Sequence, residues 1–273
     1  MAIKLKLRRF STFLKINGTE HYPVMHREVS SLIGDFLDHV GSNRNCQLVD
    51  GTFGGGNHSV PLLTKHPNLR VLGTDLDSKV MENCREQYAG LIKEKRLALE
   101  HSNYINIPLI NTKEAFGKRI GVNQLHDIAL LDLGFSSYQL EDEARGFSYI
   151  GNDDQPLDMR FDSERDRSEQ STAFEIINNS QEMELNEIFK RFGDERFHSV
   201  LARKIIEARQ QAGRAAITTT GEFKQAIRDA FPTSARDEKN QIIKRAFQAI
   251  RIATNYELLN LNRFLDQCPT QVL

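Results

Sequence analysis

The chain has 273 residues, of which 39% are hydrophobic and 27% are charged, a balance that is ordinary for a globular protein. No apolar run approaches the roughly twenty residues that a membrane-spanning helix needs, so we expect no membrane association. The formal net charge of −1 predicts no general attraction to polyanions, although a local basic surface can still bind RNA.

The first nineteen residues differ in composition from the rest of the chain. Residues 1–19 contain lysine, arginine and hydroxyl side chains, and no acid occurs before Glu20. This composition is typical of an organellar transit segment. A basic tail that contacts RNA is the alternative interpretation.

The cysteines and histidines give no sign of a metal centre. Cys46, Cys84 and Cys268 are odd in number and lie far apart, and no histidines are paired at ligand spacing. We therefore predict reduced, structural thiols, an intracellular setting and no metal site.

A glycine-rich turn follows the first strong strand pattern. Residues 47–59 read QLVDGTFGGGNHS, in which a short apolar run ends at Asp50 and four glycines occur within residues 51–56. Glycine allows positive φ angles and brings backbone N–H groups close to a ligand. A second apolar run ends at Asp75, which would lie at the tip of the next strand and accept from ribose hydroxyls. Together they predict a site for an adenosine-containing ligand.

Alternating strand and helix patterns predict an α/β fold with a parallel sheet. Four short apolar runs predict strands at about 46–50, 70–75, 97–101 and 127–133. Helices are predicted at about 26–39, 57–65, 78–92 and 112–119. Three of these strands end in acids, Asp50, Asp75 and Asp132, which we expect to line the crevice at the carboxyl edge of the sheet.

The second half of the chain has a helical pattern. Residues 134–170 are polar and too long for a simple connection, so we interpret them as a functional loop. Helices are predicted at about 194–211 and 239–265. Between them, another helix is predicted to begin at the capping box of Thr219 and Glu222 and to end at Pro232. The last helix is expected to end before Pro269 and to bury Phe247, Ile250, Leu258 and Leu261.

The glycine turn does not fit a nicotinamide dinucleotide well. Ser59 stands where the third glycine of that fingerprint would allow close packing of helix on strand. Acids at the three strand ends suit S-adenosylmethionine better, with Asp50 near its amino-acid end and Asp75 on its ribose.

The chain resembles the S-adenosylmethionine-dependent family, methyltransferase H type, that methylates cytosine N4 in small-subunit ribosomal RNA of bacteria and mitochondria. The matching segments are HYPVMHREV (21–29), DGTFGGGNHS (50–59), GTDLD (73–77), LLDLGFSSYQL (130–140), ARGFSY (144–149), PLDMRFD (156–162), GDERF (193–197) and RAFQAIRI (245–252). The resemblance covers about residues 20–262 and implies a Rossmann-like class I methyltransferase sheet with a helical insertion domain.

The resemblance also implies the residues of the site. The cofactor pocket would contain Gly56, Asn57, His58, Asp75, Tyr104, Asp132 and Gln139. Asp132 would also be the catalytic residue, because an acceptor for the cytosine amine orients it and localises its lone pair. The substrate base would contact Phe135, Phe147, Asp158 and Arg160. The alternative is that the two phenylalanines belong to the core and that Asp158 and Arg160 form a pair fixing the loop.

The implied domain order divides the chain into four parts. These are a mitochondrial transit segment at 1–19, the cofactor-binding core at 20–135, a loop and helical insertion at 136–240, and a return helix at 241–273. The family continues beyond this point with further strands, so we expect an incomplete sheet of four strands, an open edge on the fourth, and reduced stability or activity.

The expected function is therefore S-adenosylmethionine-dependent N4-methylation of a cytidine in mitochondrial small-subunit ribosomal RNA. The expected partner is that RNA or an assembling small subunit, in the mitochondrial matrix or alternatively the cytoplasm, and a homodimer is left open. The alternatives are a non-catalytic cofactor-binding isoform or ribosome-assembly factor, and a methyltransferase for DNA or a small amine.

Overall fold

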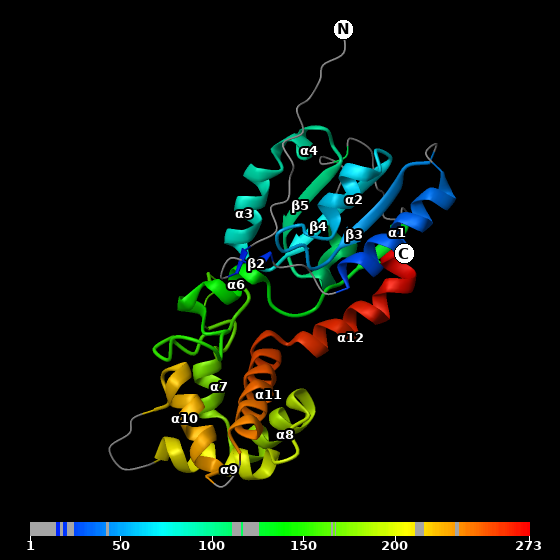
Figure 1. Ribbon diagram of the computed structural model, residues 1–273. Coiled ribbons are helices and arrows are strands. Elements are labelled where there is room, and N and C mark those ends of the chain that lie inside the picture. The colour runs from blue at the N-terminus through cyan, green and yellow to red at the C-terminus, as the bar shows by residue number, and fades with distance from the viewer. Residues whose placement is uncertain are drawn as a thin grey trace.

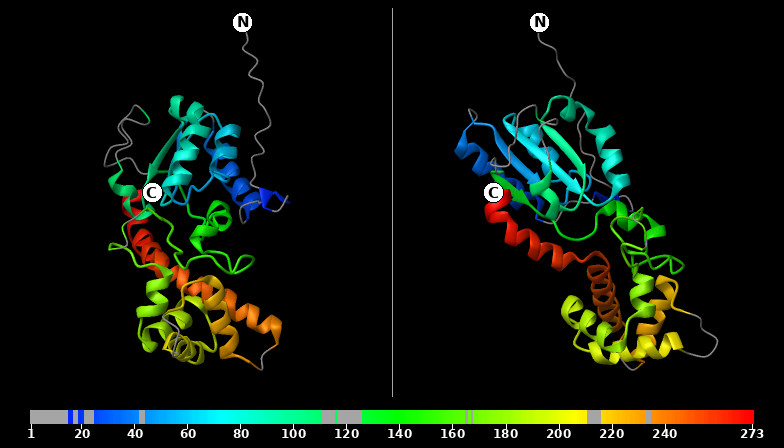
Figure 2. Two further views of the ribbon diagram at one scale, coloured as in Figure 1. Left: turned by 90° about the vertical axis from the view of Figure 1, so that its left-hand side faces the viewer. Right: turned by 180° about the vertical axis from the view of Figure 1, so that it is seen from behind.

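The computed structural model describes residues 15–16, 19–20, 25–41, 44–110, 116, 126–164, 166, 168–210, 216–232 and 235–273. Most of the predicted transit segment and of the predicted helix at 112–119 lie outside these residues. The molecule has a sheet half and a helical half at opposite ends, joined by the loop after the last strand and by two helices near the C-terminus (Figures 1 and 2).

A parallel four-stranded sheet forms the centre of the first half. Its strands are β3 (Cys46–Asp50), β4 (Leu69–Asp75), β5 (Leu97–His101) and β6 (Ile128–Leu130), in the order β5-β4-β3-β6. A separate antiparallel pair joins β1 (Lys15–Ile16) to β2 (Thr19–Glu20). The first three sheet strands confirm the predictions, because continuous apolar runs are typical of strands buried on both faces.

The fourth strand is shorter than the predicted 127–133. It pairs only with Leu48, Val49 and Asp50, at Ile128, Ala129 and Leu130. Beyond Leu130 the chain leaves the sheet, and the amide of Asp132 donates to Thr52 Oγ1 instead of to a strand. In the described part of the chain, no strand pairs with the outer edge of β6.

Helices cover both faces of the sheet. One face carries α1 (His26–Val40), α2 (Ser59–Lys65), α3 (Ser78–Gln87) and α4 (Ala89–Lys93), which bury Leu37, Leu63 and Met81 against the strands. The other face carries η1 (Tyr104–Leu109) and the last two helical elements of the chain, which bury Phe264 and Val272 against Val49 and Leu72. This arrangement confirms the predicted Rossmann-like α/β fold. The predicted helix at 78–92 divides at Tyr88, whose φ of −106° and ψ of 20° are not helical.

The helical half begins with a loop that contains α6 (Ser137–Glu141) and η2 (Glu143–Arg145). Its main helices are α7 (Ala173–Asn179), α8 (Glu182–Gly193), α9 (His198–Gln210), α10 (Thr220–Ala230) and α11 (Arg236–Asn255). The capping box of Thr219 and Glu222 opens α10 as predicted. The helix predicted from Asp194 instead begins at His198, because Asp194 has a φ of 47° and closes α8.

The prediction of one long helix at 239–265 is wrong, because this segment forms two helices. Helix α11 ends at Asn255, Tyr256 takes a left-handed conformation with φ 52°, and α12 (Glu257–Gln267) continues in a new direction. Phe247 and Ile250 are buried as predicted, whereas Leu258 is exposed. The break redirects α12 from the helical half onto the sheet (Figure 1).

The last residues of the chain pack against the sheet half. Pro269 lies within a π-helical turn, η3 (Cys268–Val272), which continues directly from α12 rather than closing it. Val272 is fully buried, and its carbonyl accepts a hydrogen bond of 2.6 Å from the backbone N–H of His126. This tail therefore covers a sheet face without adding a strand.

The three cysteines belong to the core of the sheet half. Cys46, Cys84 and Cys268 are buried and form no disulfide with one another. Within the described ranges, no helix combines the length and the apolarity needed to cross a bilayer.

Candidate functional site

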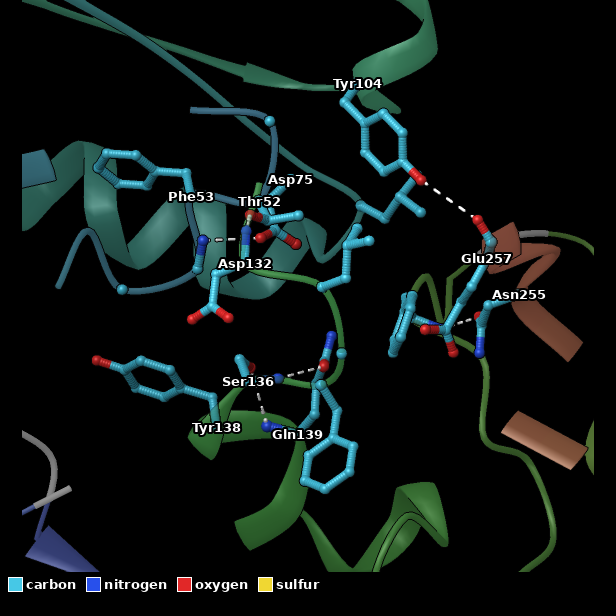
Figure 3. A pocket seen from close by; sticks show the side chains of 18 of the residues that line it. Thr52, Phe53, Asp75, Tyr104, Asp132, Ser136, Tyr138, Gln139, Asn255 and Glu257 are labelled. Atoms are coloured by element: carbon cyan, nitrogen blue, oxygen red, sulfur yellow. Dashed lines mark hydrogen bonds between the residues drawn. The ribbon is translucent and has the colours of Figure 1, made fainter. Parts of the chain in front are cut away.

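A cavity of about 220 Å³ lies at the carboxyl ends of the sheet strands, where the helical half meets the sheet half. Figure 3 shows Tyr104 and Glu257 on one side of it and Asp132 and Tyr138 on the other. Its walls are formed by Gly51, Thr52, Phe53, Gly54, Gly55, Asn57, His58, Asp75, Leu76, Ser102, Tyr104, Asp132, Leu133, Gly134, Phe135, Ser136, Tyr138, Gln139, Phe161, Asn255, Glu257 and Asn260.

Side chains of the neighbouring helix hold the glycine turn in place. Two of its carbonyls accept hydrogen bonds, the Gly54 carbonyl from Cys84 Sγ of α3 at 3.3 Å and the Gly55 carbonyl from the hydroxyl of Tyr88, just after α3, at 2.8 Å. Burial raises the pKa of the Cys84 thiol to about 12, so it remains a protonated donor. Gly56 does not line the cavity; its φ is 76°, and a Cβ there would lie 2.7 Å from the Phe53 ring. Gly56 therefore shapes the turn that presents Asn57 and His58.

Asp75 links the glycine turn to the end of β4. Its Oδ2 accepts from the amide of Gly54 at 2.7 Å, and its Oδ1 accepts from the amide of Asp77 at 3.0 Å. Burial raises the pKa of Asp75, and these two N–H donors oppose that shift. The carboxylate thus lies at the strand tip where a ribose site is predicted.

Tyr104 opens η1, shortly after β5, and lines the same cavity as Asp75. Its ring packs edge-on against Phe264 with centroids 5.5 Å apart, and its hydroxyl lies 3.5 Å from the backbone carbonyl of Glu257. Burial raises the pKa of Tyr104 to about 12, so the side chain is a neutral, flat surface at physiological pH.

Asp132 lies two residues after the end of β6 and extends into the cavity (Figure 3). Its Oδ2 lies 3.3 Å from His58 Nε2, and its amide donates to Thr52 Oγ1 at 2.7 Å. The His58 ring is buried, whereas 40% of the Asp132 side chain is exposed. The carboxylate is therefore held by its backbone and by His58 while its outer surface remains open to a ligand.

Asp50 does not reach the cavity, which corrects the expectation that all three strand-end acids line it. Its carboxylate is buried and accepts from the Ser59 hydroxyl at 2.5 Å and from the Thr52 amide at 3.2 Å. Burial raises the pKa of Asp50 to about 6. It fastens the turn to α2 instead of facing the amino-acid end of a cofactor.

Gln139 lines the cavity, but its amide is engaged in the loop. Its Oε1 accepts from the Ser136 amide at 2.8 Å and completes a capping box, and its Nε2 donates to Asp77 Oδ2 at 3.2 Å. The side chain therefore anchors the loop after β6 beside the tip of β4.

The four residues expected to bind a base separate into two groups. Phe135 lines the cavity and is 39% exposed, whereas Phe147 is buried in the helical core. Asp158 and Arg160 lie outside the cavity lining and pair with each other, with both contacts at 2.9 Å. Phe135 therefore remains a candidate for base stacking, whereas the Phe147 ring lies in the core, as in the alternative interpretation. For Asp158 and Arg160 the structure supports the alternative of a pair that fixes the loop.

Three cavity residues were not anticipated from the sequence because they depend on the break at Tyr256. Asn255, Glu257 and Asn260 reach the cavity from the junction of α11 and α12. The side chain of Asn255 donates to the Met159 carbonyl and accepts from the Phe161 amide. A helical pattern that continues through Tyr256 gives no signal for this turn.

Among the described residues, no group of three or more His, Cys, Asp and Glu side chains has the arrangement of a metal site. The polar groups around the cavity are instead carboxylates, amides, hydroxyls and one imidazole on a glycine turn. Such a set suits an organic ligand with hydroxyl and amine groups.

Comparison with known proteins agrees with this geometry. Residues 18–273 match the MraW methylase family. The protein named ribosomal RNA small subunit methyltransferase H in Thermobifida fusca is 38% identical over 90% of this chain and 68% of the relative. The protein of that name in Micrococcus luteus is 40% identical over 87% of this chain and 67% of the relative. The protein of that name in Thermosipho africanus is 34% identical over 92% of this chain and 76% of the relative. The parallel sheet with helices on both faces is that of a Rossmann-like class I methyltransferase, and the chain belongs to the MraW methylase family.

Proposed function

We propose that this protein transfers a methyl group from S-adenosylmethionine to the N4 amine of a cytidine in small-subunit ribosomal RNA. The observation that carries this function is the meeting of Asp75, Tyr104 and Asp132, from the ends of three strands, around one glycine turn. The family and the names of its members support a methyltransferase of ribosomal RNA.

The residues of the cavity fit S-adenosylmethionine. Each oxygen of the Asp75 carboxylate accepts one backbone N–H and retains capacity for a ribose hydroxyl. Tyr104 offers a flat, neutral ring to a purine. A Cβ added at Gly55 would lie 3.1 Å from the Tyr138 ring, so the bare backbone keeps this part of the cavity open. When bound, the cofactor supplies an electrophilic methyl group on a sulfonium centre.

Asp132 orients the accepting amine. The cytosine amine is a weak nucleophile because its lone pair is delocalised into the ring, and a carboxylate that accepts one N–H localises that lone pair. His58 holds one oxygen of Asp132 and leaves acceptor capacity for the amine. The methylated amine sheds its proton readily, so positioning rather than a strong base provides most of the acceleration.

The cellular setting is part of this proposal. The basic, acid-free composition of residues 1–19 supports import into the mitochondrial matrix, with the cytoplasm as the alternative. Imaging a fluorescent protein fused behind residues 1–40 distinguishes the two. The substrate is the free ribosomal RNA or an assembling small subunit, and light scattering of the purified protein decides between monomer and homodimer.

Methyl transfer tests the function directly. The purified chain is incubated with labelled S-adenosylmethionine and intact small subunits, naked small-subunit RNA or DNA. We expect label in a cytidine of small-subunit RNA. Label in DNA alone would overturn the RNA substrate, and cofactor binding with no transfer would support a non-catalytic assembly factor instead.

Two variants test the assigned roles. Asp75→Ala should raise the Kd for the cofactor roughly tenfold or more, because charged hydrogen bonds to the ribose are lost. Asp132→Ala should lower kcat about a hundredfold while binding persists. Glu100→Ala, an exposed acid on β5, is the matched control and should change neither quantity. Unchanged uptake by Asp75→Ala would refute the proposed ribose site.

A further inference from the structure

An ion pair spans the break between the last two long helices. Arg251 in α11 donates from Nε to Glu257 Oε1 at 2.8 Å and from Nη2 to Oε2 at 3.2 Å, and both side chains are largely buried. In a continuous helix, residues six apart do not face each other. The left-handed Tyr256 makes this pair possible by turning α12 back toward Arg251.

The same guanidinium group reaches the loop after β6. Its central carbon lies 5.2 Å from the centroid of the Phe135 ring, within the range of a cation–π contact. A Cβ added at Gly134 would lie 3.9 Å from Arg251 Nη1, so the guanidinium also lies along the backbone of this loop. One planar group therefore joins α11, α12 and the loop that carries Asp132.

Phe135 is the aromatic ring whose orientation matters most for a substrate. It lies three residues after Asp132, lines the cavity and retains 39% exposure. Phe161 also lines the cavity but packs with the helical half, where it stacks on the buried Phe147. The loop of residues 131–136 has no regular secondary structure. Its ends are fixed at the Asp132 amide and at the Ser136 capping box, and Arg251 contacts the part between them.

We propose that Arg251, held by Glu257, is a positioning residue that orients the Phe135 ring against the substrate base and so couples the helical half to the methyl-transfer site. This role rests on the proposed function, because it takes the base beside Asp132 to be the methyl acceptor. Arg251 is suited to this role because a planar guanidinium can form a bidentate pair with a carboxylate and stack on an aromatic ring at the same time. A lysine ammonium cannot do both.

Kinetics of matched variants test the role. Arg251→Lys keeps the charge but loses the stacked plane, and we expect it to raise KM for the RNA about five- to tenfold. The Kd for the cofactor should change by less than about twofold, because Arg251 is not among the cavity-lining residues. Arg203→Lys, at an exposed arginine that pairs with Glu207 across one helix turn, is the control. An unchanged KM for Arg251→Lys would overturn the proposal.

A double variant separates positioning from a merely structural role. If Arg251 acts through the ring, adding Arg251→Lys to Phe135→Leu should cause no further rise in KM. Effects that multiply would show that the two residues act independently and would overturn the proposal. Glu257→Gln should reproduce part of the Arg251→Lys effect.

A spectroscopic measurement works even without methyl transfer. A 4-fluorophenylalanine placed at position 135 should give one sharp ¹⁹F resonance in the wild type, and a shifted or broadened one with Arg251→Lys. Identical spectra would overturn the proposal regardless of activity. If the wild type transfers no methyl group but its ¹⁹F spectrum still differs from that of Arg251→Lys, the proposed function is refuted. The contact between Arg251 and the Phe135 ring is then retained.

Discussion

Single side chains around the glycine turn have measurable roles that differ from their predicted ones. Asp50 is the clearest case, because the residue expected at the cofactor is buried beneath the turn and bonded to Ser59 and Thr52. Titration of Asp50 should therefore affect the free energy of unfolding rather than the binding of the cofactor.

The raised pKa of Asp50 predicts a pH-dependent stability. Burial raises this pKa from 3.8 to about 6, so the folded state holds the proton more tightly than the unfolded state between these values. The resulting stabilisation is complete below about pH 4 and is lost as the pH rises through about 6. The free energy of unfolding of the wild type should fall relative to that of Asp50→Asn by about 2–3 kcal/mol between pH 4 and pH 7. Denaturant titrations that give parallel pH profiles would contradict this.

The hydroxyl of Tyr88 should affect cofactor affinity without contacting the cofactor. Tyr88→Phe removes the donor to the Gly55 carbonyl and leaves the ring against Phe53. One lost hydrogen bond of about 1 kcal/mol predicts a three- to tenfold higher Kd, measured by calorimetry. Tyr149→Phe makes the same chemical change in the helical half, where the ring packs on Phe247, and should leave the Kd unaltered.

At the scale of elements, α12 has one face committed to the sheet and another that is exposed. Phe264 is 2% exposed and packs on Tyr104, whereas its neighbour Leu265 is 54% exposed. Adjacent residues of one helix therefore give a matched pair of substitutions.

Phe264→Ala should lower the free energy of unfolding by about 3–5 kcal/mol, because it removes a buried ring and leaves a cavity. Leu265→Ala should lower it by less than about 0.5 kcal/mol. Urea unfolding followed by circular dichroism measures both. Similar losses for the two variants would mean that α12 is not seated on the sheet as described.

At the scale of the whole molecule, a buried arginine joins the two halves. Arg145 Nη1 donates to Asp77 Oδ2 at 3.0 Å at the tip of β4, and its Nη2 donates to the carbonyls of Arg160 and Phe161 at 2.8 Å. The Phe161 amide in turn donates to Asn255 at the end of α11. The loop of the helical half is thereby fixed to the strand that carries Asp75.

Loss of this arginine should destabilise the protein strongly. Arg145→Ala leaves Asp77 buried without its cationic partner, which predicts a loss of about 3–5 kcal/mol in the free energy of unfolding. Arg203→Ala, whose pair with Glu207 is exposed, should cost less than about 0.5 kcal/mol. Thermal and urea unfolding of both variants provide the measurement, and equal effects would exclude a role for the buried pair.

The sequence by itself determined the sheet strands β3, β4 and β5, the glycine turn, the positions of Asp75 and Asp132 and the family. These features are local, because a buried apolar run, a turn rich in glycine and an acid at a strand end each depend on adjacent residues. Parallel strands also bring their carboxyl ends to one edge, so distant acids could be assigned to one site without coordinates.

Tertiary structure alone decided which side chains face the cavity. Glu257 lies beside Tyr104 although 153 positions separate them in the chain, and Asn255 joins it because α11 ends there and Tyr256 turns the chain into α12. Phe135 stays open to the cavity while Phe147 is buried, although both are phenylalanines in one polar loop. Such outcomes depend on how the sheet half and the helical half pack together, and contacts between residues far apart in the chain leave no periodic signal in either segment.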